Sequence, residues 1–503
     1  MHLLAFAIAT ILSAPQLTTL YSSLDERSVA QHFAFYELYP DTTEGRNALK
    51  HAWELLSGGC VECDPEVLFP SIDAGPIIAL VNRASEEAAP ALNEEQLRVI
   101  EKLAKHLPNR KLKGSQVWTR EELAKLSPEE IDVSHGLLVA EMGLEEKQKV
   151  RELEASLDLM ALQILARLHI DATPLEKIRV MNDYIFSELR FRFPPHSLYA
   201  KNIDHYTLLP SVIEGRRGVC LGVSILYLSL AQRVGLNLRA ITPPGHIYVS
   251  YKDDADNVTN IETTARGIDV PSEAYLSLET RKLQERNFKE VIGLAFMNQA
   301  AVAWHKNDPK AAIDLYEKAL IYLPKDPLIQ TFLGFQYLFI GEKKKGEKLL
   351  KEMRNVLPDH QVTADTVADD YLAHKTSAEG IRAIFEEVDE TRTSILKKQA
   401  ELEKILTEYP NFRAGIFHLA VTHLQLGREK QAIPLLERYM SLDATNPTVC
   451  YYLSALYLQR LDYNASWKYL KAAETAVSAR NHAPKALKDL RAALQRSCPE
   501  PLS

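Results

Sequence analysis

The chain has 503 residues, a net charge of −8, and 46% apolar and 25% charged residues. This length exceeds one ordinary hydrophobic core, so we expect about two to four domains. The composition is that of a globular protein rather than a disordered one, and without a basic excess it predicts no nucleic-acid partner. Five cysteines are too few for a disulfide scaffold.

The N-terminus begins with an apolar run at residues 3–14. The run is too short to cross a membrane as a helix, and no other stretch is long and apolar enough, so we expect no integral membrane span. Residues 1–20 fit either a signal peptide or an apolar N-terminal helix, although no Lys or Arg precedes the run and Pro15 directly follows Ala14. We favour an exported, periplasmic protein over a cytoplasmic one.

Residues 21–165 are predicted to be a helical N-terminal region. Apolar residues recur at helical spacing in 28–38, 44–56, 93–107 and, most regularly, 145–168. The basic stretch 108–118 is expected to be a loop. This region shows no catalytic constellation.

Cys60 and Cys63 form a single C-x-x-C pair in this first region. A zinc site needs further ligands at similar spacing, and the sequence has no second C-x-x-C. A local disulfide or two free thiols therefore explains the pair better than a metal site.

Cys220 marks the start of a long apolar helix expected at 219–234. Gly215 and Gly218 supply a turn before it, and Gly235 ends it. The partial positive charge and N–H groups of a helix N-terminus stabilise a thiolate and can hold an oxyanion. Taken alone, Cys220 is still better explained as a small buried apolar residue.

Strands are expected after this helix at 238–242, 246–251 and 258–263, separated by Pro243-Pro244-Gly245 and by the polar turn 252–257. A hairpin symmetric about Asp254 sets residue 250 opposite 258, 248 opposite 260 and 246 opposite 262. His246 and Glu262 would then be direct cross-strand neighbours, with Cβ atoms about 5 Å apart. A slip of one residue would place them on opposite faces.

A thiol at a helix start, a histidine and a carboxylate together make a nucleophile, a base and an orienting acid. The segment resembles the transglutaminase-like superfamily of papain-type thiol folds, and within it the compact bacterial branch that is often fused to tetratricopeptide repeats. The matching residues are Gly218-Val219-Cys220, Tyr227, Leu230, Arg233-x-Gly235-Leu236, Pro244-Gly245-His246 and Glu262-Thr263-Thr264, with a matching lead-in at 175–193 and 205–214.

This resemblance implies that Cys220 is the nucleophile, His246 the general base and Glu262 the orienting acid, with no cofactor and no metal. The superfamily usually has Asp at the third position, and Asp269 is a nearby substitute for Glu262. Members of the bacterial branch often lack the cysteine and bind rather than catalyse. The domain is predicted to span 166–285.

Residues 286–503 repeat themselves with a period of 34. Gly334, Gly346 and Leu350 follow Ala300, Ala312 and Tyr316 at this offset, and Ala420, Ala432 and Leu436 precede Ser454, Ser466 and Leu470 in the same way. Small residues at these positions allow paired helices to approach closely, a pattern that resembles the tetratricopeptide repeat. Matched pairs are expected at 293–360 and 413–480, with an irregular helical stretch at 361–410 and a capping helix at 484–496.

The sequence thus predicts a multidomain, mainly α protein in which an α+β transglutaminase-like (papain-type) domain precedes a tetratricopeptide α-solenoid. Two functions remain open. One is a thiol-dependent acyl transferase or hydrolase, of the protease, amidase or transglutaminase type, acting on a protein or peptide held in the repeat groove. The other is a non-catalytic scaffold or adaptor with a degenerate transglutaminase-like domain.

Overall fold

The computed structural model describes residues 14–58, 72–85, 87–195, 206–354, 356–389 and 391–500. Residues 1–13, most of the predicted signal segment, lie outside these ranges, as do Cys60 and Cys63. The chain forms two compact units. The first comprises Met1–Ala240, Ile247–Asp269 and Asn287–Ile292, and the second comprises Ile241–His246, Val270–Arg286 and Gly293–Ser503.

The first unit begins with the helical region predicted from apolar spacing. Its helices are α1 Ala14–Ser22, α2 Val29–Leu38, α3 Thr43–Leu56, α5 Gly75–Asn82, α6 Glu94–Leu103, α7 Arg120–Lys125, α8 Val133–Met142 and α9 Lys147–Arg167. Side-chain caps set the starts of α2, α3 and α6, where Ser28, Thr42 and Asn93 each accept a hydrogen bond from a first-turn N–H. The stretch predicted as a loop at 108–118 contains two 3₁₀ turns, Pro108–Lys111 and Lys113–Gln116.

Two helices form the centre of this unit. Every residue of α9 from Leu153 to Ile164 is buried, and α13, Cys220–Arg233, is buried along nearly its whole length. A helix that is buried on all sides belongs to the interior of a domain, and α9 packs directly on α13. The remaining helices here are α10 Pro174–Asn182, which continues into a π-helical turn at Asp183–Glu188, and α12 Leu209–Gly215.

Four short strands form one sheet in the order β3-β2-β1-β4. They are β1 Arg239–Thr242, β2 Tyr248–Lys252, β3 Val258–Ile261 and β4 Gln284–Arg286. In the antiparallel β2–β3 pair, Ser250 lies opposite Asn260 and Lys252 opposite Val258.

The predicted hairpin register is therefore wrong by two residues. The turn centres on Ala255 because the Asp253 carboxylate accepts hydrogen bonds from the N–H groups of Ala255 (2.9 Å) and Asn257 (2.8 Å). Such a side-chain-capped turn fixes the hairpin more strongly than loop symmetry does. Extending the register by one position sets Glu262 opposite Tyr248, and His246 lies before β2 begins.

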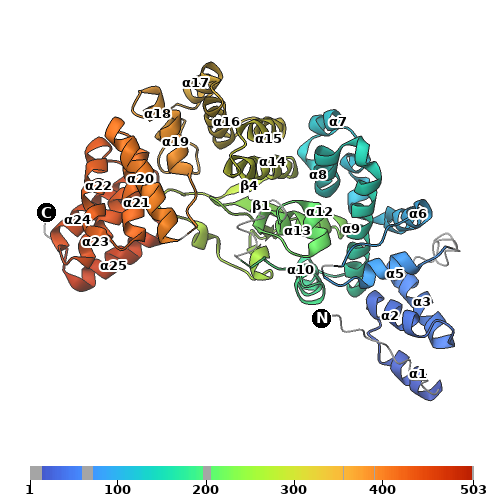
Figure 1. Cartoon of the computed structure of the whole chain (residues 1–503). Helices are drawn as coiled ribbons and strands as arrows, with labels where there is room; N and C mark the ends of the chain where they lie inside the picture. Colours follow the sequence, from blue (N-terminus) through green and yellow to red (C-terminus); the bar gives the residue numbers. More distant parts are fainter. Residues whose placement is uncertain are drawn as a thin grey trace. The chain divides into compact units, whose positions relative to one another are not determined.

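The second unit contains the repeats. Its helices are α14 Phe288–His305, whose first residues belong to the first unit, α15 Pro309–Tyr322, α16 Pro327–Phe339, α17 Lys343–Met353, α18 Val367–Leu372, α19 Ala378–Phe385, α20 Arg392–Glu408, α21 Arg413–Gln425, α22 Glu429–Leu442, α23 Pro447–Gln459, α24 Tyr463–Ser478 and α25 Lys485–Ser497. Helices α20 to α25 stack side by side, each on the next (Figure 1).

The 34-residue period is confirmed by these helices. Helices α21 and α23 start 34 residues apart, as do α22 and α24. The small residues lie at the predicted close approaches: a Cβ added to Gly346 would lie 2.8 Å from the Gly334 carbonyl oxygen, and the Ser454 and Ser466 hydroxyls are 3.2 Å apart. The stretch expected to be irregular holds the short helices α18 and α19 before the longer α20, and α25 is the predicted terminal helix. The fold is a mainly helical α+β region with one small sheet, followed by paired helices that repeat every 34 residues.

Candidate thiol site

Cys220 is the first residue of α13. Its N-cap residue, Val219, has extended backbone angles and no side chain that can accept a hydrogen bond from the first turn. Every residue from Leu221 to Ala231 is buried, whereas Cys220 is partly exposed with a free thiol. The helix thus presents a thiol at the end where its N–H groups and positive partial charge are concentrated.

Glycines allow other backbone segments to approach this helix start closely. A Cβ on Gly222 would lie 2.7 Å from the Tyr206 carbonyl oxygen and 2.7 Å from a Val212 methyl group. The same Tyr206 oxygen accepts a hydrogen bond from the Val219 N–H (2.9 Å). The backbone at Tyr206 is therefore fixed against the first turn of α13, next to Cys220 in the chain.

Glu262 lies in the same unit as Cys220 and is 6% exposed. It follows β3 directly and caps the 3₁₀ turn Thr263–Ala265, since its Oε1 accepts hydrogen bonds from the Thr264 N–H (3.1 Å) and hydroxyl (2.6 Å). The neighbouring Thr263 hydroxyl is 2.9 Å from that of Ser224, one turn beyond Cys220 on α13. The structure thus ties the Glu262 turn to the first part of α13.

Asn182 holds the rest of this turn in place. It accepts a hydrogen bond from the Tyr227 hydroxyl of α13 (2.9 Å) and donates one to the Gly267 carbonyl (3.3 Å). Gly267 has φ +78°, which favours glycine, and its N–H donates to the Glu262 carbonyl (2.8 Å). Sequence reasoning matched Tyr227 to the superfamily but did not find its partner Asn182.

Asp269 is the alternative to Glu262 that the sequence offers. Its carboxylate accepts a hydrogen bond from the Asn260 N–H (3.0 Å), and this bond holds the residues that follow the Glu262 turn against β3. This contact gives Asp269 a structural role in the described fold.

His246 belongs to the second unit, whereas Cys220 and Glu262 belong to the first. It ends a turn whose Gly245 has φ +70°, with the His246 N–H donating to the Pro243 carbonyl (3.1 Å). Its ring stacks on Tyr275 at a centroid distance of 5.8 Å and an interplanar angle of 20°. No pattern in the sequence indicated Tyr275 as a neighbour of this histidine.

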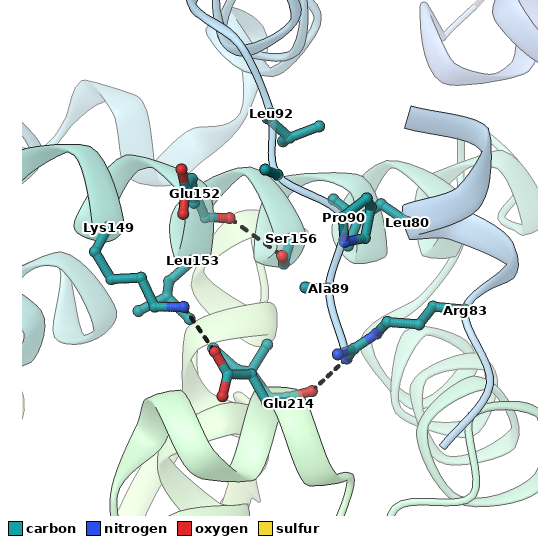
Figure 2. Close-up of a pocket in the computed structure, with 12 residues that line it drawn as sticks. Leu80, Arg83, Ala89, Pro90, Leu92, Lys149, Glu152, Leu153, Ser156 and Glu214 are labelled. Atoms are coloured by element: carbon teal, nitrogen blue, oxygen red, sulfur yellow. Dashed lines mark hydrogen bonds and ion pairs between the residues drawn. The ribbon is translucent and has the colours of Figure 1, made fainter. Parts of the chain in front are cut away.

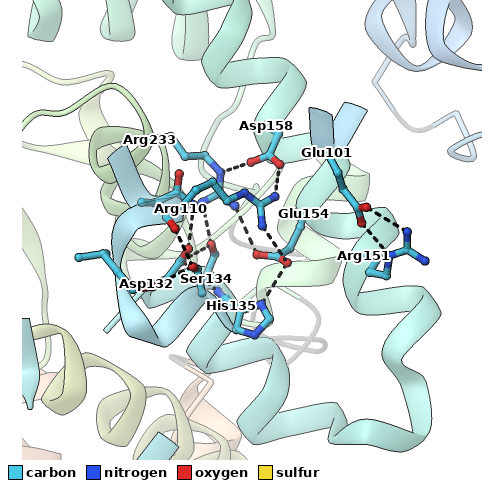
Figure 3. A network of polar contacts seen from close by, with 12 residues as sticks. Glu101, Arg110, Asp132, Ser134, His135, Arg151, Glu154, Asp158 and Arg233 are labelled. Atoms are coloured by element: carbon cyan, nitrogen blue, oxygen red, sulfur yellow. Dashed lines mark hydrogen bonds and ion pairs between the residues drawn. The ribbon is translucent and has the colours of Figure 1, made fainter. Parts of the chain in front are cut away.

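The far end of α13 is anchored in a buried ionic network (Figure 3). Arg233 is completely buried and donates to Asp158 (2.8 Å) and to the Ser134 hydroxyl (2.8 Å). Arg110 pairs with the other oxygen of Asp158, which lies on α9. The network therefore ties α13 to α8 and α9. The sequence signal was a single arginine in an otherwise apolar helix, matched to the superfamily without a role.

His135 extends this network. Burial has the largest single effect and opposes the charged form, but the Glu154 carboxylate at 3.0 Å, Asp132 and the Val117 carbonyl together raise the pKa of His135 above its ordinary value. The ring also contacts the Val117 carbonyl at 2.7 Å. Both ring nitrogens of His135 thus have partners within this network, which gives the buried histidine a structural role.

A separate pocket of about 150 Å³ lies between α9, α12 and the segment after α5 (Figure 2). The Lys149–Glu214 ion pair (2.7 Å) lies at its rim, and Arg83 donates to the Ile213 carbonyl (2.7 Å). Cys220 does not line it. Its contacts hold α12 against α9 and give the pocket a structural explanation.

Within the part of the chain that the structure describes, no three His, Cys, Asp or Glu residues are grouped so that they could hold a metal ion. In the same residues, no helix combines the length and apolar character needed to cross a lipid bilayer.

Comparison with known families matches one part of the chain. Residues 151–289 match the model of the transglutaminase-like superfamily. The transglutaminase-like domain so defined contains Cys220, His246 and Glu262, and also the anchor residues Asp158 and Arg233. No curated protein matches the chain.

Solved structures of repeat proteins align with part of the chain. A tetratricopeptide protein of Thermus thermophilus, TTC0263, is 19% identical, with 41% of this chain and 98% of that chain covered and a TM-score of 0.20. The type IV pilus biogenesis factor PilW is 15% identical over 41% of this chain and 93% of its own, with a TM-score of 0.21. Likenesses of this size carry no argument about function, and the repeat architecture rests on the 34-residue period and the helix pairs.

Proposed function

We propose that the transglutaminase-like domain is a thiol-dependent acyl transferase or hydrolase that acts on a protein or peptide presented by the repeats. One observation supports this proposal most directly. Cys220 is the partly exposed first residue of a buried helix whose N-terminus no side chain caps. The N–H groups at this helix end can donate hydrogen bonds to an oxyanion that forms beside the sulfur.

In the proposed reaction, the Cys220 sulfur attacks the carbonyl carbon of a carboxamide or peptide bond. A C–S bond forms, the C–N bond breaks, and the imidazolium of His246 protonates the leaving amine. Glu262 orients the imidazole. Water or a second amine then attacks the thioester, which releases the acyl group and restores the thiol. First-turn N–H groups of α13 are the proposed donors to the oxyanion.

Trapping of the acyl-enzyme tests this chemistry. The full chain is incubated with a p-nitrophenyl ester of a short peptide, and the acyl group is located by mass spectrometry of proteolytic fragments. We expect acylation of Cys220 in the wild type, none at this position in Cys220→Ala, and a rate reduced at least about tenfold in His246→Ala. Equal rates in the wild type and His246→Ala, or equal acylation of Cys498, would refute the proposal.

A non-catalytic scaffold is the second candidate, and one observation favours it. Glu262 Oε1 already accepts two hydrogen bonds from Thr264, so this carboxylate has a structural task that requires no chemistry. In that case the repeats bind partners and the thiol is incidental. Partner capture and cellular phenotype that are identical in the wild type and in Cys220→Ala would support the scaffold.

A further inference from the structure

A segment of the chain lies on the repeats in the manner of a bound peptide. Residues 276–281 run past 360–362, the stretch between α17 and α18. The Arg281 N–H donates to the His360 carbonyl (3.0 Å), the Val362 N–H donates to the Glu279 carbonyl (2.9 Å), and Thr280 forms an antiparallel bridge with Gln361. This is β-strand addition, in which main-chain hydrogen bonds hold an extended segment and its side chains give specificity.

Glu279 supplies the specific contacts on the repeat side. One carboxylate oxygen accepts a hydrogen bond from the Thr363 hydroxyl (2.6 Å) and the other from the Thr448 hydroxyl at the start of α23 (3.0 Å). Leu278 packs beside it on the apolar cluster that contains Val362 and Trp467. Because each carboxylate oxygen has its own hydrogen-bond donor, the site recognises the orientation of the carboxylate as well as its charge.

The two flanks of the segment are also fixed. Arg281 donates to the Asp359 carbonyl (2.5 Å) and to the Arg480 carbonyl (2.8 Å), and it pairs with the Asp359 carboxylate. The His482 ring lies 2.7 Å from the Ser277 carbonyl oxygen. The segment therefore contacts two parts of the repeats: the stretch between α17 and α18, and the loop after α24. These contacts are additional to the packing of one repeat helix on the next.

The same segment leads directly to His246. Tyr275, which stacks on the His246 ring, ends the 3₁₀ turn Ser272–Tyr275, three residues before Leu278. All of these residues belong to the second unit. Three residues span at most about 11 Å, so the part of the segment held on the repeats is directly connected to the residue that packs on the imidazole.

We infer that residues 276–281 are a tethered ligand of a peptide-binding surface on the repeats, and that their displacement moves Tyr275 away from His246. The displacing partner is a protein with an extended segment of the same chemistry, an apolar residue followed by Glu and, two positions later, Arg. This inference rests on the proposed function, because displacement of the segment would regulate catalysis only if His246 is the catalytic base. Tyr275 is then a positioning residue.

Binding of a labelled hexapeptide, LSLETR, which has the sequence of residues 276–281, tests the tethered ligand. The tether holds its own segment at an effective concentration that suppresses a competitor, so the wild-type chain should bind the peptide weakly. Glu279→Gln weakens the tethered copy, and we expect it to bind the peptide about tenfold more tightly. Glu273→Gln is the matched control and should behave as wild type, because Glu273 is exposed and lies before the segment, in the turn Ser272–Tyr275.

Two results would overturn the tethered ligand. One is equal affinity of the wild type and Glu279→Gln for the peptide. The other is equal binding of a peptide with Gln in place of Glu. If Glu279→Gln lowers the melting temperature enough to unfold the chain, Leu278→Ala is used in the same assay, with the same expected rise in affinity.

The coupling to His246 is measured by NMR of its ring resonance in histidine-labelled protein. Tyr275→Leu removes the ring current and sets the direction of the shift. Glu279→Gln, and the added peptide, should move the His246 resonance in that direction, and Glu273→Gln should not. An unmoved resonance would overturn the coupling. A moved resonance without acylation of Cys220 would instead refute only the proposed function.

Discussion

Replacement of Arg233 by Met should destabilise the first unit strongly. The substitution leaves the aliphatic volume but removes the guanidinium that bonds Asp158 and Ser134. Asp158 has no exposed surface and would keep only Arg110 as a cationic partner. Removing one member of a buried ion pair costs about 3–5 kcal/mol, because the other charge stays buried and poorly compensated.

Hydrogen exchange measured by mass spectrometry on peptides from α9 and α13 reports on this unit separately from the repeats. A loss of about 3 kcal/mol corresponds to exchange faster by a factor of about one hundred or more. Arg98→Ala, which removes an exposed ion pair with Glu94, is the control and should cost less than about 1 kcal/mol. Equal protection in Arg233→Met and Arg98→Ala would refute the account of the anchor.

Two further predictions concern the same unit. Gly222→Ala forces a Cβ against the Tyr206 carbonyl and should lower the free energy of unfolding, measured in urea, by about 1–3 kcal/mol. Gly215→Ala is the control: its Cβ meets no atom within 4 Å, so the free energy of unfolding should be unchanged or slightly higher. An unchanged stability in Gly222→Ala would contradict the close approach. His135→Gln removes an imidazole whose pKa is raised above its ordinary value, because the nearby Glu154 and other partners act against the effect of burial. The stabilisation by His135 is complete below its unfolded pKa of about 6.5 and is lost as pH rises through the raised folded value, so the wild-type advantage should be larger at about pH 6 than at about pH 9. If the stability difference between the wild type and His135→Gln grew with pH, the pKa of His135 would not be raised on folding.

The repeats could be predicted because their physical cause is local and periodic. Close helix pairs need small residues at fixed spacing, so Gly334, Gly346, Ser454 and Ser466 are visible in the sequence and lie where expected. The start of α13 could be predicted for a similar reason, since glycines before an apolar run mark a helix N-terminus at Cys220.

The hairpin and the anchor could not be predicted in the same way. The position of the turn depends on which side chain caps it. Because Asp253 caps it, the turn centres one residue later than the sequence predicts, and each residue of β2 faces a residue two positions later on β3. The partners of Arg233 come from α8 and α9, far away in sequence, and nothing in the spacing of Asp158 connects it to α13. Contacts that depend on tertiary packing leave no periodic trace.

Peptide-resolved alkylation of Cys220 by iodoacetamide across pH is the most direct test of the proposed thiol site. Cys450 is an internal control, because burial raises its pKa to about 11 and it should stay unmodified in the folded chain. We predict that Cys220 reacts faster than Cys498 at about pH 6–7 and that His246→Ala slows it at least about tenfold. Alkylation of Cys220 at the same rate with and without His246, over the whole pH range, would contradict the proposed pair.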